Sequence, residues 1–136
     1  MNFTSQICTT KEQSEKLLAL GLKRETADCI LVKDAFKKDH YLIFPIVDVD
    51  ETLENEMCDE PIPAWSLNRL IEMIPTVITH EDYSLILGIN STCVYYADDE
   101  YAETFKAFEG NLYECVVKCI DWLIKDGYFN KEYLEK

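Results

Sequence analysis

The sequence predicts an α+β protein, with a small, mostly antiparallel sheet of about three strands, including a hairpin, packed against three or four helices. Two β-rich runs, 83–89 and 91–97, lie almost end to end and predict the hairpin. Apolar residues recur at helical spacing over 67–74 and 112–123, which predicts two amphipathic helices. A chain of 136 residues with 48% hydrophobic content is long and apolar enough to form a single globular domain, residues 1–136.

The first helix is predicted over residues 10–20. Thr9 or Thr10 suits the N-cap position, and Thr10 with Gln13 three residues later completes a capping-box pattern. Gly21 follows the last apolar position and predicts the end of the helix. Next, a short helix or turn over 24–29 gives way to an extended segment at 30–32, although helix and strand compete there because so short a run has no decisive period.

A strand is predicted over 40–49, where β-branched and aromatic residues predominate, and Pro45 indicates a bulge or a sheet edge. The acidic stretch 48–63 that follows is typical of a solvated loop. Pro75 predicts the end of the next helix, whose apolar face consists of Leu67, Leu70, Ile71 and Ile74.

Trp65 stands two residues ahead of that apolar face, so it could hold the fold together or contact a partner. From this position the indole can reach Arg69 for a cation–π contact, or fold over the sheet edge as a packing cap. We expect the packing role.

In the predicted hairpin, Asn90 is a candidate for a turn position with positive φ. The acidic, aromatic segment 98–110 then leads to the last helix. Asn111 is a plausible N-cap for this helix, and Gly127 predicts its end. The apolar stripe between them consists of Leu112, Cys115, Val116, Cys119, Ile120 and Leu123.

The charge of the chain restricts its partners. There are 26 Asp and Glu residues against 13 Lys and Arg, giving a net charge of −13. This field repels nucleic-acid phosphates and anionic lipid, so we expect no direct binding to nucleic acid or membrane, and it favours a partner protein with a basic surface. The N-terminus has no signal-peptide pattern and no apolar run is long enough to span a bilayer, so we expect a cytoplasmic protein whose cysteines are reduced.

Cysteine and histidine offer the first candidates for chemistry. Cys115 and Cys119 share a helix face and could begin a zinc site, but no CxxC or paired histidine supplies further ligands, so core packing is favoured. A thiol–imidazole pair could form between Cys29 and His40 or between Cys93 and His80. The competing hypothesis, which we favour, is that both histidines are exposed and the cysteines buried.

Acidic and aromatic residues offer the second candidates. The densest acidic run lacks the glycine of a calcium-binding EF-hand loop, since Leu53 occupies that position. A weak divalent site or docking of a basic partner stays open for this run, beside the simpler role of a charged loop. Adjacent Tyr95 and Tyr96 must face opposite sides of a strand, so one belongs to the core. The predicted interaction surface consists of Asp48, Asp50, Glu51, Glu54, Glu56 and Tyr101.

Common catalytic and nucleotide-binding motifs do not occur in the chain. GxGxxG, GxxxxGK[ST], GxSxG and HExxH are all missing, and with four glycines a phosphate-cradling loop is hard to build. We therefore predict no cofactor, no metal and no catalytic residue, although missing motifs alone do not exclude an enzyme.

Three blocks of sequence carry a resemblance: TKEQSEKLLALGLKRETAD, PAWSLNRLIEMIP and CIDWLIKDGYFNKEYL. In order and spacing they resemble a group of small uncharacterised proteins that recur in gut Bacteroidetes and in their phages or mobile elements. None of the blocks is a catalytic motif. The resemblance implies a cytoplasmic accessory protein, associated with phage.

Three functional hypotheses follow. The first is a non-enzymatic interaction or regulatory module that binds a protein through its acidic surface. The second is a small enzyme or ligand-binding domain with a Cys, His and carboxylate site between the sheet and the C-terminal helix. The third is a self-associating structural protein; the sequence does not specify the oligomeric state.

Overall fold

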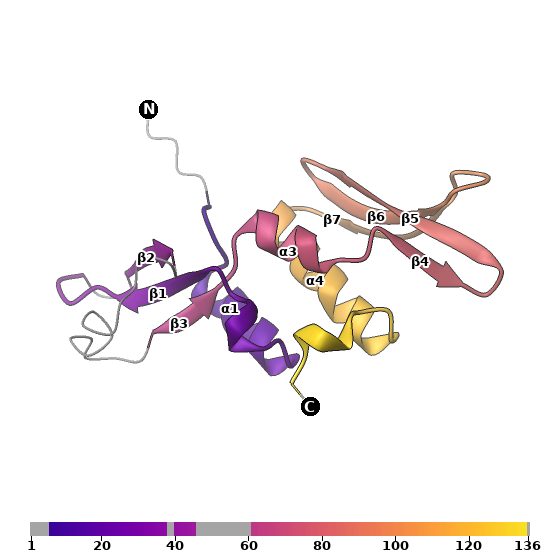
Figure 1. The fold of residues 1–136 in the computed structure, drawn as a ribbon. Coiled ribbons are helices and arrows are strands. Elements are labelled where there is room, and N and C mark those ends of the chain that lie inside the picture. The colour runs from indigo at the N-terminus through magenta and orange to yellow at the C-terminus, as the bar shows by residue number, and fades with distance from the viewer. Residues whose placement is uncertain (1–5, 38–39, 46–60, 136) are drawn as a thin grey trace. The chain divides into compact units, whose positions relative to one another are not determined.

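The computed structural model describes residues 6–37, 40–45 and 61–135. These residues form two compact units, one containing the described chain up to Arg69 together with Glu135, and one containing Leu70–Leu134. Three α-helices and two antiparallel sheets occur in the described residues (Figure 1), which confirms the α+β class. The prediction of one sheet of about three strands is wrong, because the sheets have three and four strands.

The start of the first unit follows the local sequence signals. Helix α1, Lys11–Ala19, begins after Thr10, whose side chain and that of Gln13 form the predicted capping box. A 3₁₀ turn at Arg24–Thr26 then leads into strand β1, Cys29–Lys33. The turn followed by extended chain is therefore confirmed.

The sheet of the first unit has the strand order β2–β1–β3. Strand β2, Tyr41–Pro45, lies at one edge, so the edge position predicted from Pro45 is confirmed. It begins one residue later than predicted, and residues 46–49 of the predicted strand lie outside the described residues. Strand β3, Ile62–Ala64, overlaps the end of the stretch 48–63, which is predicted to be a loop. It is only three residues long and has a proline at its centre, so its sequence carries almost no strand signal.

Trp65 lies in the core of the first unit, with no solvent-exposed surface. Its indole Nε1 donates to Thr26 Oγ1 at 3.0 Å, and its backbone N–H donates to Thr9 Oγ1 at 3.0 Å. Arg69 directs its Nε to the carbonyl oxygen of Thr26 at 2.8 Å. The packing role is therefore confirmed, but Trp65 is a central residue rather than a cap on the sheet edge.

Helix α3, Leu67–Met73, leads from the first unit into the second, and its start is held by side chains. Ser66 Oγ accepts from the backbone N–H of Arg69, and Asp28 accepts from the backbone N–H of Ser66 at 2.8 Å. Leu70 on the predicted apolar face is fully buried.

The sheet of the second unit has the order β4–β5–β6–β7. Strands β5, Tyr83–Asn90, and β6, Cys93–Asp98, form the predicted hairpin. Strand β4, Val77–His80, and strand β7, Thr104–Glu109, were not predicted. Their sequences are short or flanked by acidic residues, so they resemble the loops around them.

The turn of the hairpin differs from the prediction for Asn90. This residue ends β5, and its side-chain oxygen accepts from the backbone N–H of Thr92 at 3.0 Å. In the described residues, the non-glycine residues with positive φ are Glu81 and Ala102. An Asx-type hydrogen bond therefore forms the turn without positive φ at Asn90.

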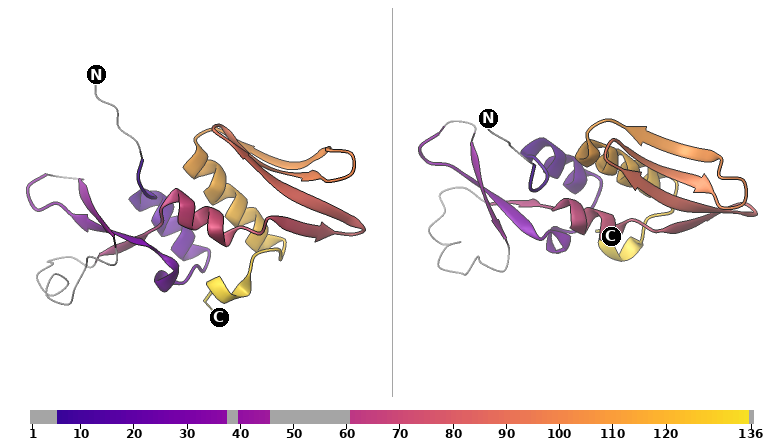
Figure 2. Two further views of the ribbon diagram at one scale, coloured as in Figure 1. Left: turned by 45° about the horizontal axis from the view of Figure 1, so that its top comes forward. Right: turned by 90° about the horizontal axis from the view of Figure 1, so that it is seen from above.

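Helix α4, Leu112–Lys125, packs along one face of this sheet, against β6 and β7 (Figure 2). Asn111 is its N-cap, as predicted, and Gly127 beyond its end has a φ of 81°. We call the face that α4 covers the inner face; Tyr96 points into it and is fully buried, while Tyr95 is half-buried. A 3₁₀ turn at Lys131–Tyr133 follows.

No helix among the described residues is long and apolar enough to cross a membrane.

Gly88 and Tyr95 form a cross-strand pair on the outer face, and a Cβ atom at Gly88 would overlap the tyrosine ring. We therefore expect Gly88→Ala to displace this ring and lower the free energy of unfolding by about 1–2 kcal/mol, measured by urea denaturation. In a Tyr95→Ala background the same change should be neutral or stabilising, since alanine suits a strand better than glycine. A destabilisation of equal size in both backgrounds would contradict the ring-overlap explanation.

Candidate functional site

Strand β7 contains a β-bulge at Phe105. Tyr96 pairs with Lys106 but its neighbour Ala97 pairs with Thr104, so Phe105 is an extra residue in β7. A bulge redirects the side chain at the point where it occurs. The ring of Phe105 turns to the inner face, where its centroid lies 4.7 Å from that of His80 and 6.3 Å from that of Trp122.

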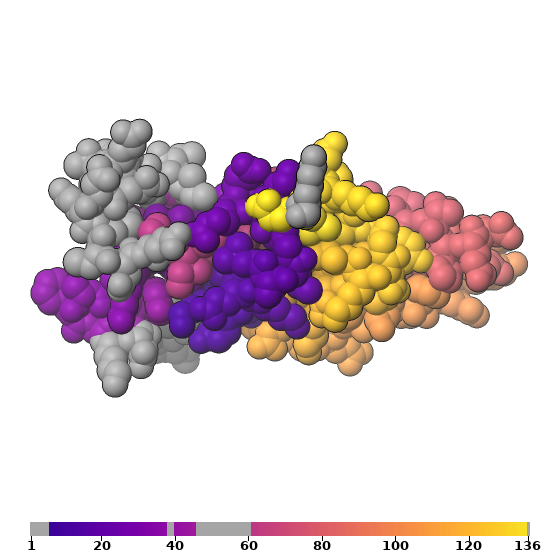
Figure 3. Space-filling view, turned by 90° about the horizontal axis from the view of Figure 1, so that it is seen from below, coloured from indigo at the N-terminus to yellow at the C-terminus, as the bar shows by residue number. Residues whose placement is uncertain are grey.

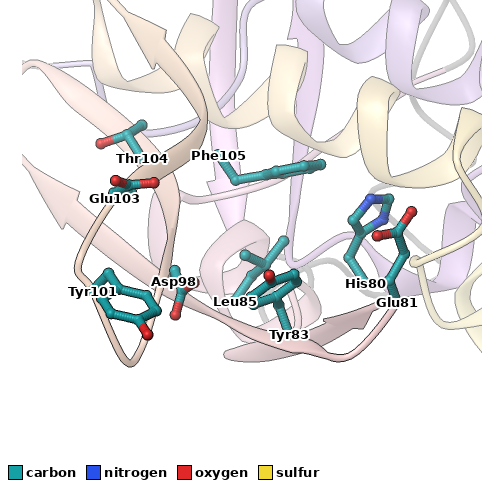
Figure 4. A pocket seen from close by; sticks show the side chains of 9 residues that line it. All are labelled: His80, Glu81, Tyr83, Leu85, Asp98, Tyr101, Glu103, Thr104 and Phe105. Carbon is teal, nitrogen blue, oxygen red and sulfur yellow. The ribbon is translucent and has the colours of Figure 1, made fainter.

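Beside this ring, the inner face has an open hollow of about 530 Å³, which we call the inner groove. In Figure 4, Phe105 extends over Leu85 toward His80, while Tyr101 and Asp98 lie at the other end. In Figure 3, the C-terminal segment in yellow covers only part of the second unit, and β4 and β5 (salmon) reach beyond it. The groove is lined by His80, Glu81, Tyr83, Leu85, Asp98, Tyr101, Glu103, Thr104 and Phe105.

His80 is half-buried at one end of the inner groove. Its Nδ1 lies 2.6 Å from the hydroxyl oxygen of Tyr128, which follows α4, and Phe105 packs against its ring. The prediction that His80 is exposed is wrong, because aromatic side chains from separate segments cover it. His40 is exposed, as predicted, and its Nδ1 lies 3.2 Å from Oδ2 of Asp34. The hydrogen bond from the backbone N–H of Phe36 lowers the pKa of the Asp34 carboxyl, and the hydrogen bond with His40 lowers it further.

Carboxylates and exposed rings meet in the inner groove. Glu81, Asp98 and Glu103 contribute three carboxylates. One oxygen of Asp98 accepts from the backbone N–H of Glu100 at 2.7 Å, which holds the carboxylate in place. The aromatic rings have large exposed fractions: 49% for Tyr83, 68% for Tyr101 and 45% for Phe105. A surface with this composition can hold a cationic side chain both by charge and by contact with ring faces.

Of the predicted interaction surface, the structure places Tyr101 in the groove. The acidic residues predicted with it, Asp48, Asp50, Glu51, Glu54 and Glu56, lie outside the described residues. The other groove residues were not predicted, because they come from different strands and turns of the second unit. The closest sequence signal was the acidic, aromatic segment 98–110, which supplies several of them.

The cysteines of the described chain are free thiols, and most are buried. Burial raises the pKa of Cys8 to about 12, of Cys29 to about 11 and of Cys119 to about 12, and it also raises the pKa of Cys115. Thiols with such pKa values are protonated at neutral pH and are poor nucleophiles. The packing role predicted for Cys115 and Cys119 is confirmed, since both are fully buried.

The two histidines contact other groups than the thiols considered from the sequence. His40 and His80 contact Asp34 and Tyr128 rather than forming a described thiol–imidazole pair. Within the described ranges, no three His, Cys, Asp or Glu side chains gather closely enough to hold a metal ion.

The chain matches no protein-family model, no curated protein and no solved structure.

Proposed function

We propose that this protein is a non-enzymatic interaction module that binds a basic segment of another protein in the inner groove. The observation that carries the proposal is the convergence of three carboxylates and three exposed aromatic rings in one hollow of about 530 Å³. The net charge of −13 would steer a basic partner toward the chain, and the groove would then select it. In keeping with the sequence resemblance, such a module would act in the cytoplasm as a phage-associated regulator.

The chemistry of the groove supports binding of Lys or Arg side chains. The carboxylates of Asp98 and Glu103 would attract the guanidinium or ammonium group of such a side chain, while its methylene stem packs on Phe105 or Tyr101. Tyr and Phe rings order few rotatable bonds on binding, so they add contact area at low entropic cost. The groove therefore combines charge steering with short-range recognition.

A second candidate function is a small ligand-binding domain or enzyme that uses the same hollow. The contact between His80 and Tyr128 favours it, since a histidine that is hydrogen-bonded beside carboxylates can exchange protons. The buried, protonated thiols offer no nucleophile for this alternative. Binding without chemistry is therefore the function that we favour.

Titration with a fluorescent peptide rich in lysine and arginine tests the proposal. We expect salt-dependent binding, weakened about tenfold or more by the double variant Asp98→Asn and Glu103→Gln. The matched control, Asp126→Asn with Glu132→Gln, removes the same charge from exposed positions elsewhere in the second unit and should change binding little. Failure of the wild type to bind at low salt, or equal losses in both double variants, would refute a specific groove.

A further inference from the structure

Strand β7 is an edge strand, and its hydrogen-bonding pattern identifies the backbone groups that its open side presents. Gly110 N donates to Thr92 O, and Asp98 N donates to Glu103 O, so Glu103 and Gly110 face β6. Bonding groups alternate along an antiparallel strand, so Lys106 and Phe108 also face β6. The backbone groups of Thr104, Ala107 and Glu109 therefore point away from β6, and no described strand pairs with that side.

The two faces of the second unit are hollowed beside this open edge. The inner groove includes Thr104 and Phe105 of β7. A second hollow of about 590 Å³, which we call the outer hollow, includes Ala107 and Glu109 of the same strand. Its other lining residues are Asn90, Thr92, Cys93, Tyr95, Thr104 and Gly110, so Glu109 carries its only formal charge among these residues.

We propose that the basic segment of the partner binds in extended form as a fifth strand, next to β7; this inference rests on the proposed function. Side chains of an added strand alternate between the faces of a sheet. Every second side chain would lie on the inner face, and the one beside Thr104 and Phe105 would enter the inner groove, where Asp98 and Glu103 favour Lys or Arg. The side chains on either side of it would enter the outer hollow, where the single carboxylate of Glu109 favours a cation less than the three carboxylates of the inner groove do. The recognised segment thus has a basic residue beside Thr104 and Phe105, with an uncharged residue before it and another after it.

The edge of β7 has few of the features that prevent strand addition. Proteins commonly protect an edge with proline, with a very short strand or with a lysine. Strand β7 has six residues and no proline, and its one bulge, at Phe105, leaves the residues from Lys106 to Glu109 in regular register with β6. Its lysine, Lys106, places Nζ over the ring of Phe108 on the same strand, 5.7 Å from the ring centroid. The four residues from Thr104 to Ala107 are all exposed, so the edge is open to a partner.

Two peptides of identical composition test the alternation. One carries lysine at every second position with threonine or valine between, and the other carries the same lysines in adjacent pairs. We expect the alternating peptide to bind about tenfold more tightly or better, because in the paired peptide a lysine that enters the inner groove always has a second lysine next to it that must enter the outer hollow. Equal affinity for the two peptides would overturn the strand model.

Amide hydrogen exchange provides a direct readout in the wild-type protein. Binding of the alternating peptide should slow exchange at two or more of the Thr104, Ala107 and Glu109 amides, while Lys106 and Phe108 already bond to β6. The variant Ala107→Pro removes one outward N–H and should weaken binding about tenfold, with Ala107→Val as the control that keeps the N–H. Unchanged exchange, together with full binding by Ala107→Pro, would overturn strand addition.

These outcomes separate the two proposals. If binding needs Asp98 and Glu103 but neither alternation nor the β7 amides, the groove remains and the fifth strand is wrong. If neither peptide binds to the wild type at low salt, both proposals are wrong.

Discussion

Replacing Trp65 with alanine should lower the free energy of unfolding by about 3–5 kcal/mol. The side chain has no exposed surface, so its removal leaves a large cavity in the core of the first unit. The change also deprives Thr26 Oγ1 of the donor at Nε1, 3.0 Å away, and this oxygen lies where water cannot easily replace the indole. Urea denaturation followed by far-ultraviolet circular dichroism measures the loss, because this signal does not depend on tryptophan.

Trp65→Phe and Thr26→Val divide this effect into its parts. Phenylalanine keeps much of the volume but cannot donate to Thr26, so we expect a loss of about 1–2 kcal/mol from the hydrogen bond, and more if packing also suffers. Thr26→Val removes the acceptor, and the double variant should lose less than the sum of the two single losses. Additive losses would show that the hydrogen bond contributes nothing.

A further control is to determine which strands lose stability when Trp65 is replaced. Amide exchange in the Trp65→Ala variant should speed up in β1 and β3 of the first unit, since Trp65 directly follows Ala64 of β3 and Ala64 pairs with Cys29 of β1. Full stability of Trp65→Ala would contradict the central packing role.

The helices could be predicted because their signals are local. Thr10 and Gln13 lie three residues apart and cap α1, while the repeat of apolar residues from Cys115 to Leu123 defines the buried side of α4. The hairpin was equally accessible, since two β-rich runs follow each other with a minimal turn. In each case the interacting residues are close in the sequence.

The number of sheets could not be predicted because it depends on pairing between distant residues. Strand β3 exists because Ala64 pairs with Cys29, and nothing in a three-residue run with proline indicates this partner. Strand β7 carries four consecutive exposed residues, so the alternation expected of a half-buried strand is weak. Such strands are specified by the sheet that they join rather than by their own residues.

The inner groove could not be predicted either, because its residues are distant in the sequence and because one of its contacts depends on a bulge. Tyr101 was identified because it lies in an acidic, aromatic segment. Phe105 belongs to the same segment, but its contact with His80 depends on the bulge in β7, and no residue type in this segment indicates a bulge. The surroundings of His80 looked polar along the chain, although Tyr128, 48 residues away, covers it in the fold.

Raising the pH above 9 should destabilise both units, because buried thiols resist ionisation. In the unfolded chain a cysteine titrates near pH 9.0, whereas burial raises the pKa of Cys119 to about 12 and that of Cys8 to about 12. Since the folded pKa is the higher one, the full stability is present below pH 9 and is lost as the pH rises toward 12. Across this window each such thiol should lower the free energy of unfolding by about 1.4 kcal/mol per pH unit.

Cys119→Ala distinguishes this linkage from general alkaline damage. The variant loses packing at every pH, so its curve of stability against pH should start lower, but its slope above pH 9 should be shallower by the contribution of one proton. Urea denaturation from pH 7 to 11, with the thiols kept reduced, measures both slopes. Parallel curves for wild type and variant would mean that the Cys119 thiol ionises equally in the folded and unfolded chains, and hence that water reaches it in the folded protein.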